Sequence, residues 1–252
     1  MKLAPKKTAS KTFPVPTPKF ATLTSWSYAV YTQYMKCALS VCFDKIQRIR
    51  IIEPANPHFE KGNRVHAAAE AYIKSTGRAP AIIPELAAVK DRLAIFRKLK
   101  AMTERDWAFN RQWKPTGWFA PDAWLRVKVD VAAIDSGPPP LVYITDWKTG
   151  KMYDDHRQQR SLYALAGLQL LELGALPSAA KDSEVVAEHL YTDTTQSATE
   201  RFKPKDLAPL KREWLARIKQ MMSDTKYPAK TGFHCRYCKF RKSAGGPCKE
   251  DQ

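Results

Sequence analysis

The stretch VDVAAIDSGPPPLVYITDWKTGK, residues 129–151, constrains the fold of this chain more than any other part of the sequence. Residues 124–135 and 141–148 are two runs rich in β-branched, aromatic and other apolar side chains. The Gly-Pro-rich segment 136–140 interrupts them, as a turn does between two strands. This pattern predicts a β-hairpin.

An aspartate lies inside each expected strand, where a half-buried strand normally carries Val or Ile. If the turn centres near Pro138, Asp130 and Asp146 are equally far from it and face each other. Opposed side chains have Cβ atoms about 4.5–5.5 Å apart, so these like charges repel. A divalent cation would relieve the repulsion, and carboxylate oxygens suit Mg²⁺ or Mn²⁺. The alternative is a register shifted by one residue, which leaves both groups as solvated surface charges.

A lysine follows the second aspartate at a distance of two residues. Side chains alternate along a strand, so Asp146 and Lys148 share one face while Trp147 points to the other. The hairpin therefore predicts two carboxylates and one ammonium group on a single patch.

The bulk composition favours a soluble protein with a polyanionic partner. The chain has 252 residues, of which 44% are hydrophobic, and its net charge is +17. That charge points to nucleic acid, although a solvated basic face is the alternative. No run approaches the roughly 18 consecutive apolar residues of a membrane span, so we expect no membrane partner. We expect residues 1–20, which contain no acid, to be a flexible basic tail without an export signal, and the protein to be cytoplasmic.

Hydrophobic periodicity and glycine punctuation predict helices on both sides of the hairpin. We expect a further strand over residues 184–192, and helices over residues 22–49, 63–75, 85–111, 154–174 and 204–222. This order predicts an α/β fold with a small mixed central sheet flanked by helices, N-terminal helices and a cysteine-rich C-terminal segment.

Two pairs of polar residues share helix faces. His66 and Glu70 are four residues apart, as are Gln159 and Tyr163. An imidazole and a carboxylate can both reach one metal ion or its water, and an amide and a phenol can hydrogen-bond a phosphate or a base. Taken alone, each pair is better explained as an ordinary surface or core pair. The acidic hairpin downstream favours the metal role for His66 and leaves that of Glu70 open.

The cysteines favour metal binding over disulfides, because their number is odd and no export signal precedes them. They are Cys37, Cys42, Cys235, Cys238 and Cys248. The three C-terminal thiolates need a fourth ligand, for which Cys37, Cys42 and, at a zinc site, His234 are the candidates. Four thiolates suit tetrahedral zinc or a [4Fe–4S] cluster, and free buried cysteines are the alternative.

Together these residues resemble the PD-(D/E)xK nuclease superfamily, and more closely its RecB-like exonuclease branch. That branch includes the AddB nuclease domain and the CRISPR adaptation nucleases with an iron–sulfur cluster. The resemblance extends from about residue 22 to residue 248. The motifs that carry it, in order, are GNRVHAAAE with His66, VKVDVAAID with Asp130, ITDWKTGK with Asp146 and Lys148, and QRSLY with Gln159 and Tyr163.

The resemblance implies a single nuclease domain over residues 21–249 with a restriction-endonuclease-like core. It implies Mg²⁺ or Mn²⁺ as the hydrolytic cofactor, and Lys148 as the group that holds the attacking water. The metal ligands would be His66, Asp130, Asp146 and the carbonyl group of Trp147. The catalytic residues would be Asp130, Asp146, Lys148, Gln159 and Tyr163.

The cysteines extend the resemblance. Iron–sulfur members of the branch have one cysteine far upstream and three near the C-terminus, as YMKCALSVCF and CRYCKFRKSAGGPC do. Cys37 fits the upstream place better than Cys42. The resemblance thus implies a [4Fe–4S] cluster, with zinc as the alternative, that packs residues 233–249 back on the N-terminal helix. Its ligands would be Cys37, Cys235, Cys238 and Cys248.

The expected activity is a metal-dependent exonuclease acting on DNA with a single-stranded end, in recombination, repair, or processing of phage or CRISPR DNA. A structure-specific endonuclease and a non-catalytic DNA-binding subunit on the same fold are the alternatives. Intact Asp130, Asp146 and Lys148 argue against the last of these, since a dead copy has little reason to keep opposed carboxylates.

Overall fold

A six-stranded mixed sheet forms the centre of the computed structural model, which describes residues 19–53, 56–152, 156–194 and 196–249. The strand order is β2-β1-β3-β4-β5-β6, with β4 and β5 parallel and all other neighbours antiparallel. The strands are β1 (Met102–Phe109), β2 (Pro115–Thr116), β3 (Leu125–Asp135), β4 (Leu141–Lys148), β5 (Glu184–Tyr191) and β6 (Ser197–Phe202).

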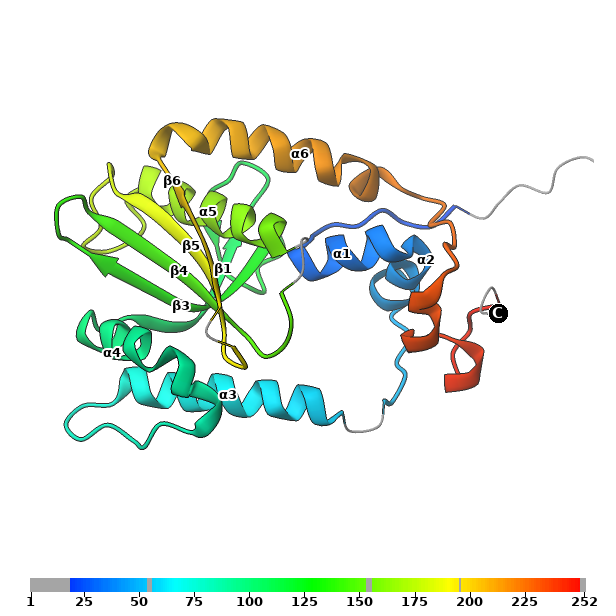
Figure 1. The fold of residues 1–252 in the computed structure, drawn as a ribbon. Coiled ribbons are helices and arrows are strands. Elements are labelled where there is room, and N and C mark those ends of the chain that lie inside the picture. Colours follow the sequence, from blue (N-terminus) through cyan, green and yellow to red (C-terminus); the bar gives the residue numbers. More distant parts are fainter. Residues whose placement is uncertain (1–18, 54–55, 153–155, 195, 250–252) are drawn as a thin grey trace, which may run out of the picture.

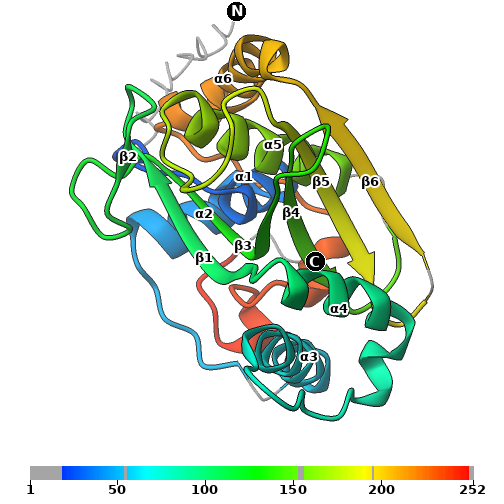
Figure 2. The same ribbon diagram turned by 90° about the vertical axis from the view of Figure 1, so that its left-hand side faces the viewer.

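Helices cover both faces of this sheet (Figures 1 and 2). One face packs on α1, α5 and α6, and the other on α3 and α4, so that each face has its own apolar core. Within the described ranges, no helix has the length and apolar character needed to cross a membrane. The helical elements are α1 (Tyr28–Lys36), α2 (Ala38–Val41), η1 (Cys42–Ile46), α3 (Pro57–Lys74), η2 (Pro84–Val89), α4 (Lys90–Lys98), α5 (His156–Glu172), η3 (Pro204–Asp206), α6 (Leu207–Ser223), η4 (Phe233–Tyr237) and η5 (Lys242–Ala244).

The expected α/β class with a mixed sheet between helices is confirmed, and so is the hairpin. β3 and β4 pair antiparallel with Val131 opposite Thr145, the register of a turn centred on Pro138. One residue further along, this register brings Asp130 level with Asp146. The strand expected over residues 184–192 and the helices expected over residues 63–75, 154–174 and 204–222 are confirmed as β5, α3, α5 and α6.

The single helix expected over residues 22–49 is wrong. Cys37 has an extended backbone, with φ −161° and ψ 111°, and separates α1 from α2. Side chains satisfy carbonyl groups at the break, since Ser40 Oγ donates to the Cys37 carbonyl at 2.7 Å and Gln33 Nε2 donates to the Ser40 carbonyl at 3.1 Å. The break gives the Cys37 side chain a direction that a continuous helix would not.

The helix expected over residues 85–111 is also wrong in its second half. α4 ends at Lys98, and residues 102–109 form β1, which pairs with β3 and buries Trp107 and Phe109. The strand β3 needs a partner along this edge, and that pairing overrides the helical propensity of the segment. The sequence pattern also failed to predict β6, an edge strand with no buried residue.

Most of the expected basic tail, residues 1–18, lies outside the described residues. Phe20 belongs to the fold, because its N–H donates to the Thr225 carbonyl at 2.7 Å and its ring packs edge-on against Tyr227. The N-terminal segment therefore lies beside the stretch that follows α6.

A glycine allows α5 to lie close to the sheet. A Cβ atom on Gly167 would lie 2.5 Å from Ile144 Cδ1 and 3.3 Å from both methyl groups of Val185. Any side chain here would push α5 away from β4 and β5. The close approach matters because the first half of α5 carries Gln159 and Tyr163.

We expect Gly167→Ala to lower the free energy of unfolding, measured by urea denaturation. Overpacking costs about 1–3 kcal/mol, which exceeds the gain in helix propensity. The control is Gly62→Ala in α3, where the nearest atom to the new Cβ, Thr149 Oγ1, is 3.7 Å away. This control should keep or raise stability by about 0.5–1 kcal/mol. Equal stability of the two variants would contradict the packing argument.

Candidate active site

Three neighbouring strands bring carboxylates into a row. Asp130 lies on β3 and Asp146 is level with it on β4. On the other side, Thr103 of β1 pairs with Val131, which brings Glu104 level with Asp130. The row therefore crosses the sheet from β1 to β4.

The strands β1 and β3 are distorted where the row crosses them. Glu104 has φ 47°, a left-handed conformation that costs about 1–3 kcal/mol for a residue of this kind. Val127 and Val129 of β3 belong to the core under α5, whereas Val131 and Ala133 belong to the core under α3. The side chains of β3 therefore do not alternate regularly at Asp130, since valines before and after it belong to different cores. This irregularity accommodates a carboxylate in an otherwise apolar strand.

His66 projects from α3 toward this row. Its Nδ1 atom lies 3.2 Å from Asp130 Oδ1 and 3.9 Å from Glu104 Oε1. One ligand atom from each of these three side chains lies within 4.8 Å of the others, an arrangement that no other group of three His, Cys, Asp or Glu residues matches in the described part of the chain. Such a group offers the nitrogen and oxygen ligands that a divalent cation takes.

Glu70, whose role the sequence left open, makes different contacts. Its carboxylate pairs with Lys74 at 2.5 Å and accepts from Thr103 Oγ1 at 3.3 Å. Glu104 instead occupies the place beside His66. The sequence analysis missed Glu104 because it assigned this segment to a helix. β1 reads MTERDWAF, which shows no regular apolar–polar alternation, so only its pairing with β3 identifies it as a strand.

Residues from β4 and α5 converge on Asp146. The Tyr163 hydroxyl donates to Asp146 Oδ1 at 2.6 Å and accepts from Gln159 Nε2 at 2.6 Å. Lys148 Nζ lies 2.6 Å from Asp146 Oδ2 and donates to Gln159 Oε1 at 2.9 Å. The two-residue spacing on the strand and the four-residue spacing on the helix thus build one closed network.

The main chain of Trp147 joins the two aspartates. Its N–H donates to Asp130 Oδ2 at 2.8 Å, while its side chain is buried in the core under α3 and α4. Asp146 Oδ2 is buried and, apart from the ion pair with Lys148, has no hydrogen-bond donor among the described residues. A buried acceptor with spare capacity beside a second carboxylate fits a cation ligand.

The two aspartates differ in acidity. Burial raises the pKa of Asp130, and the charge of Asp146 raises it further against the opposing hydrogen bond from His66. Burial acts in the same direction on Asp146, but the charge and hydrogen bond of Lys148, together with further neighbours such as Tyr163, outweigh it and lower the pKa of that carboxyl group. Burial alone would lower the pKa of His66, yet its hydrogen bond and attraction to Asp130 raise it. Asp130 is therefore less well charge-compensated than Asp146 by the described side chains.

Buried polar contacts hold β4 and β5 in place behind this site. Glu188 of β5 accepts from Thr145 at 2.6 Å and from Arg92 at 2.5 Å. His189 is level with Asp146 on β5, and burial lowers its pKa to about 3, so its imidazole is neutral. These contacts fix the strand positions on which the carboxylate row depends.

A second cluster lies away from the carboxylates, between α2 and the C-terminal segment (Figure 1). Four cysteines line one cavity there: Cys37, Cys235, Cys238 and Cys248. Cys42 does not line it and instead accepts from Gln47 Nε2 at 3.8 Å. His234 lines the cavity, but its Nε2 atom is 2.9 Å from the Lys230 carbonyl.

The C-terminal segment is fixed to the N-terminal helices by few contacts. Phe240 packs on Phe43 with ring centroids 5.4 Å apart, and Lys239 pairs with Asp44 at 3.3 Å. A Cβ atom on Gly246 would lie 2.2 Å from the Phe240 carbonyl oxygen, so only glycine lets the chain return past Phe240 to Cys248.

Comparison with known proteins gives a family and a set of similar solved structures. The model of the "PD-(D/E)XK nuclease superfamily" matches residues 25–243. The chain is similar to the solved structure titled "Crystal structure of SSO0001", with 15% identity, a TM-score of 0.40, and coverage of 91% of this chain and 89% of that one. At this TM-score the likeness to that structure carries no weight. No curated protein matches the sequence.

We expect Tyr163→Phe to weaken Mn²⁺ binding about 10- to 100-fold, the usual cost of losing a group that orients a metal ligand. The change removes the 2.6 Å bond to Asp146 and keeps the buried ring. Isothermal titration calorimetry gives the affinity. The control is Tyr237→Phe, whose side chain is 74% exposed and should have no effect. Unchanged Mn²⁺ affinity in Tyr163→Phe would contradict this role.

Proposed function

Because this chain belongs to the PD-(D/E)XK nuclease superfamily, we propose that it is a Mg²⁺- or Mn²⁺-dependent exonuclease that degrades DNA from a single-stranded end. The observation that carries the proposal is the pair of opposed carboxylates with Lys148 Nζ 2.6 Å from the second. A dead homologue that only binds DNA has no need of this arrangement, because buried like charges destabilise the fold.

The carboxylate row offers ligands for the cation. Asp130 and Asp146 supply oxygens from opposite strands, and His66 supplies a nitrogen 3.2 Å from Asp130. Glu104 adds a ligand beside His66, and we propose the Trp147 carbonyl as a further one, since its N–H already bonds Asp130. A divalent cation bound here would acidify a water molecule and stabilise charge on the phosphoryl oxygens.

Lys148 is the residue that we propose to hold the attacking water. Its ammonium group bridges Asp146 Oδ2 and Gln159 Oε1 and is partly exposed, so it can also donate to a water or a phosphoryl oxygen. There it would orient the water in line with the bond to be broken and offset negative charge as it develops. Gln159 and Tyr163 act as positioning residues, because they hold Lys148 and Asp146 in place.

An exonuclease is favoured over an endonuclease by the Gln159–Tyr163 pair. This pair is the motif through which the sequence resembles the exonuclease branch, and its two side chains are joined by a 2.6 Å hydrogen bond above Asp146. An endonuclease on the same fold would share the chemistry but would cut DNA without ends.

The test is cleavage of end-labelled linear and circular single-stranded DNA in Mg²⁺, Mn²⁺ or EDTA. We expect wild type to degrade only the linear DNA, and only with metal. Asp146→Asn should abolish cleavage and Lys148→Met should slow it about 10²- to 10³-fold, while DNA binding persists. Asp182→Asn, an exposed change remote from the row, is the control. Cleavage that survives EDTA would refute the metal mechanism, and cutting of the circle would replace exonuclease with endonuclease.

For the cysteine cavity we propose a structural metal centre, with [4Fe–4S] favoured over zinc. Four cysteines facing one cavity support a four-thiolate site. Tetrahedral zinc with Zn–S bonds of about 2.3 Å needs sulfurs roughly 3.8 Å apart. No three of these sulfurs lie within 4.8 Å of one another, a spacing that suits the larger cluster.

The proposed centre would act as a staple. Residues 241–249 contain no large apolar side chain, so this segment buries little surface of its own. A metal shared with Cys37 would close a loop nearly as long as the chain, and long closures constrain the unfolded state most in the entropy model.

We expect anaerobically purified protein to be brown and to contain iron. Cys37→Ser should lower both the iron content and the Tm, because it removes the only ligand outside the C-terminal segment. The control, Cys42→Ala, should keep the iron, since Cys42 lies outside the cavity. A colourless protein with about one zinc per chain would exclude the iron–sulfur cluster and would support zinc as the structural metal. A protein with neither metal would exclude both.

A further inference from the structure

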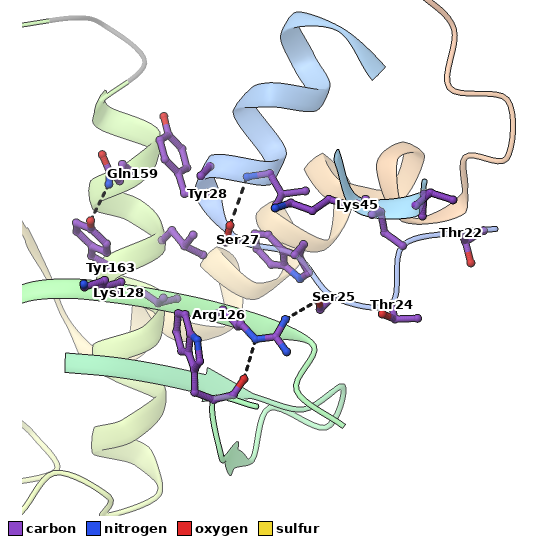
Figure 3. A pocket seen from close by; sticks show the side chains of 18 of the residues that line it. Thr22, Thr24, Ser25, Ser27, Tyr28, Lys45, Arg126, Lys128, Gln159 and Tyr163 are labelled. Carbon is purple, nitrogen blue, oxygen red and sulfur yellow. Dashed lines mark hydrogen bonds between the residues drawn. The ribbon is translucent and has the colours of Figure 1, made fainter. Parts of the chain in front are cut away.

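A groove of about 880 Å³ lies between Gln159 and Tyr163 of α5 and the N-terminal segment (Figure 3). Asp130, Asp146, Gln159 and Tyr163 line it at one end. Residues 21–30, which lead into α1, form the other end. The groove is therefore continuous with the candidate active site.

Its walls suit a polyanion. Apart from the two aspartates, all its charged side chains are basic: Lys45, Arg48, Arg126 and Lys128. Hydroxyl groups of the N-terminal segment add neutral hydrogen-bonding capacity, from Thr22, Thr24, Ser25 and Ser27. Lys and Arg side chains together with hydroxyl groups are the usual partners of phosphate oxygens.

Arg126 is fixed in this groove while its charge stays uncompensated. Its guanidinium donates to the Trp118 carbonyl at 2.8 Å and to Ser25 Oγ at 2.7 Å, both neutral acceptors. Within the described ranges it makes no ion pair. Arg92 and Arg160 each have a carboxylate partner, whereas the half-buried Arg97 and Arg241 resemble Arg126 in bonding only neutral acceptors. A preorganised guanidinium without a counter-charge is a binding group for an anion.

The place of Arg126 on β3 sets its distance from Asp130 and so from the proposed cleavage site. Arg126, Lys128 and Asp130 are every second residue of β3, and all three line the groove. A strand rises about 3.3 Å per residue, so Arg126 lies about 13 Å along β3 from Asp130. A phosphate group bound by Arg126 is therefore not the one at the cleaved bond. It belongs to a nucleotide further along the DNA strand.

Trp118 and Tyr28 also line the groove, together with the fully buried rings of Trp26 and Tyr163; the first two are its accessible aromatic side chains. Both are half-buried, and the Arg126 guanidinium lies 6.0 Å from the centre of the Trp118 ring. Aromatic rings stack on unpaired bases, whose faces are free, but not on bases inside a duplex. The volume of the groove is also that of a small-ligand site, too small to enclose a double helix.

We propose that this groove binds a single DNA strand that leads along β3 into the active site. Arg126 binds a phosphate beyond the cleaved bond, and Trp118 stacks on an unpaired base. This inference rests on the proposed function, because it takes the carboxylate row as the place of cleavage.

The test measures binding of fluorescent oligothymidine and of a duplex of equal length by anisotropy, without metal, in the cleavage-deficient background Asp146→Asn. Arg126→Met should weaken single-strand binding about tenfold and reduce the salt slope by about one. Trp118→Leu should weaken it about tenfold with the slope unchanged. The matched controls are Arg212→Met on α6 and Phe119→Leu, whose side chain is 90% exposed and outside the groove. Neither control should alter binding.

Ser25→Ala tests the charge of Arg126 separately from the hydrogen bond that holds its guanidinium group in place. It removes one hydrogen bond of Arg126 and keeps the guanidinium, so the salt slope should stay at its starting value. Binding of Arg126→Met equal to that of Arg212→Met, or tighter binding of the duplex, would overturn the inference.

The outcomes also separate this inference from the function it rests on. If wild type degrades linear DNA but the groove variants bind normally, the groove assignment fails and the nuclease assignment stands. If the groove variants lose binding as expected but wild type cleaves no DNA with Mg²⁺ or Mn²⁺, the proposed function fails and the single-strand site stands.

Discussion

Repulsion between Asp130 and Asp146 is the constraint around which this structure is organised. The antiparallel register of β3 and β4 brings the two carboxylates level, and both are buried. Two buried like charges would destabilise the fold if nothing compensated them. The ammonium of Lys148 and the imidazole of His66 offset part of this cost, and we propose that a divalent cation bound by the carboxylates offsets the rest.

The surrounding elements serve to hold this charge arrangement in place. α3 brings His66 from one side of the sheet and α5 brings Tyr163 from the other, so the site depends on both apolar cores. Gly167 allows α5 to approach closely enough for the Tyr163 hydroxyl to reach Asp146. The basic groove then adds positive charge on the side from which a phosphate chain would enter. Compensation of the two carboxylate charges thus links the packing of α3 and α5 on the sheet to the proposed metal site and substrate groove.

The sequence predicted the parts of the site that depend on local spacing. The turn centre alone placed Asp130 opposite Asp146, the strand period placed Asp146 and Lys148 on one face, and the helix period did the same for Gln159 and Tyr163. It did not predict what depends on long-range pairing. Glu104 was missed because its segment reads as helix until β3 pairs with it. The extended backbone of Cys37 is equally non-local, since contacts with the C-terminal segment accompany it.

The central claim is that the opposed carboxylates share one divalent cation. Anomalous diffraction from crystals soaked in Mn²⁺ tests it directly. The account predicts a peak bound by Asp130 and Asp146, with ligand distances of about 2.0–2.2 Å, and no such peak in Asp130→Asn. A Mn²⁺ ion bound elsewhere, with Asp146 held only by side chains such as Lys148 and Tyr163 and no density between the two strands, would contradict it.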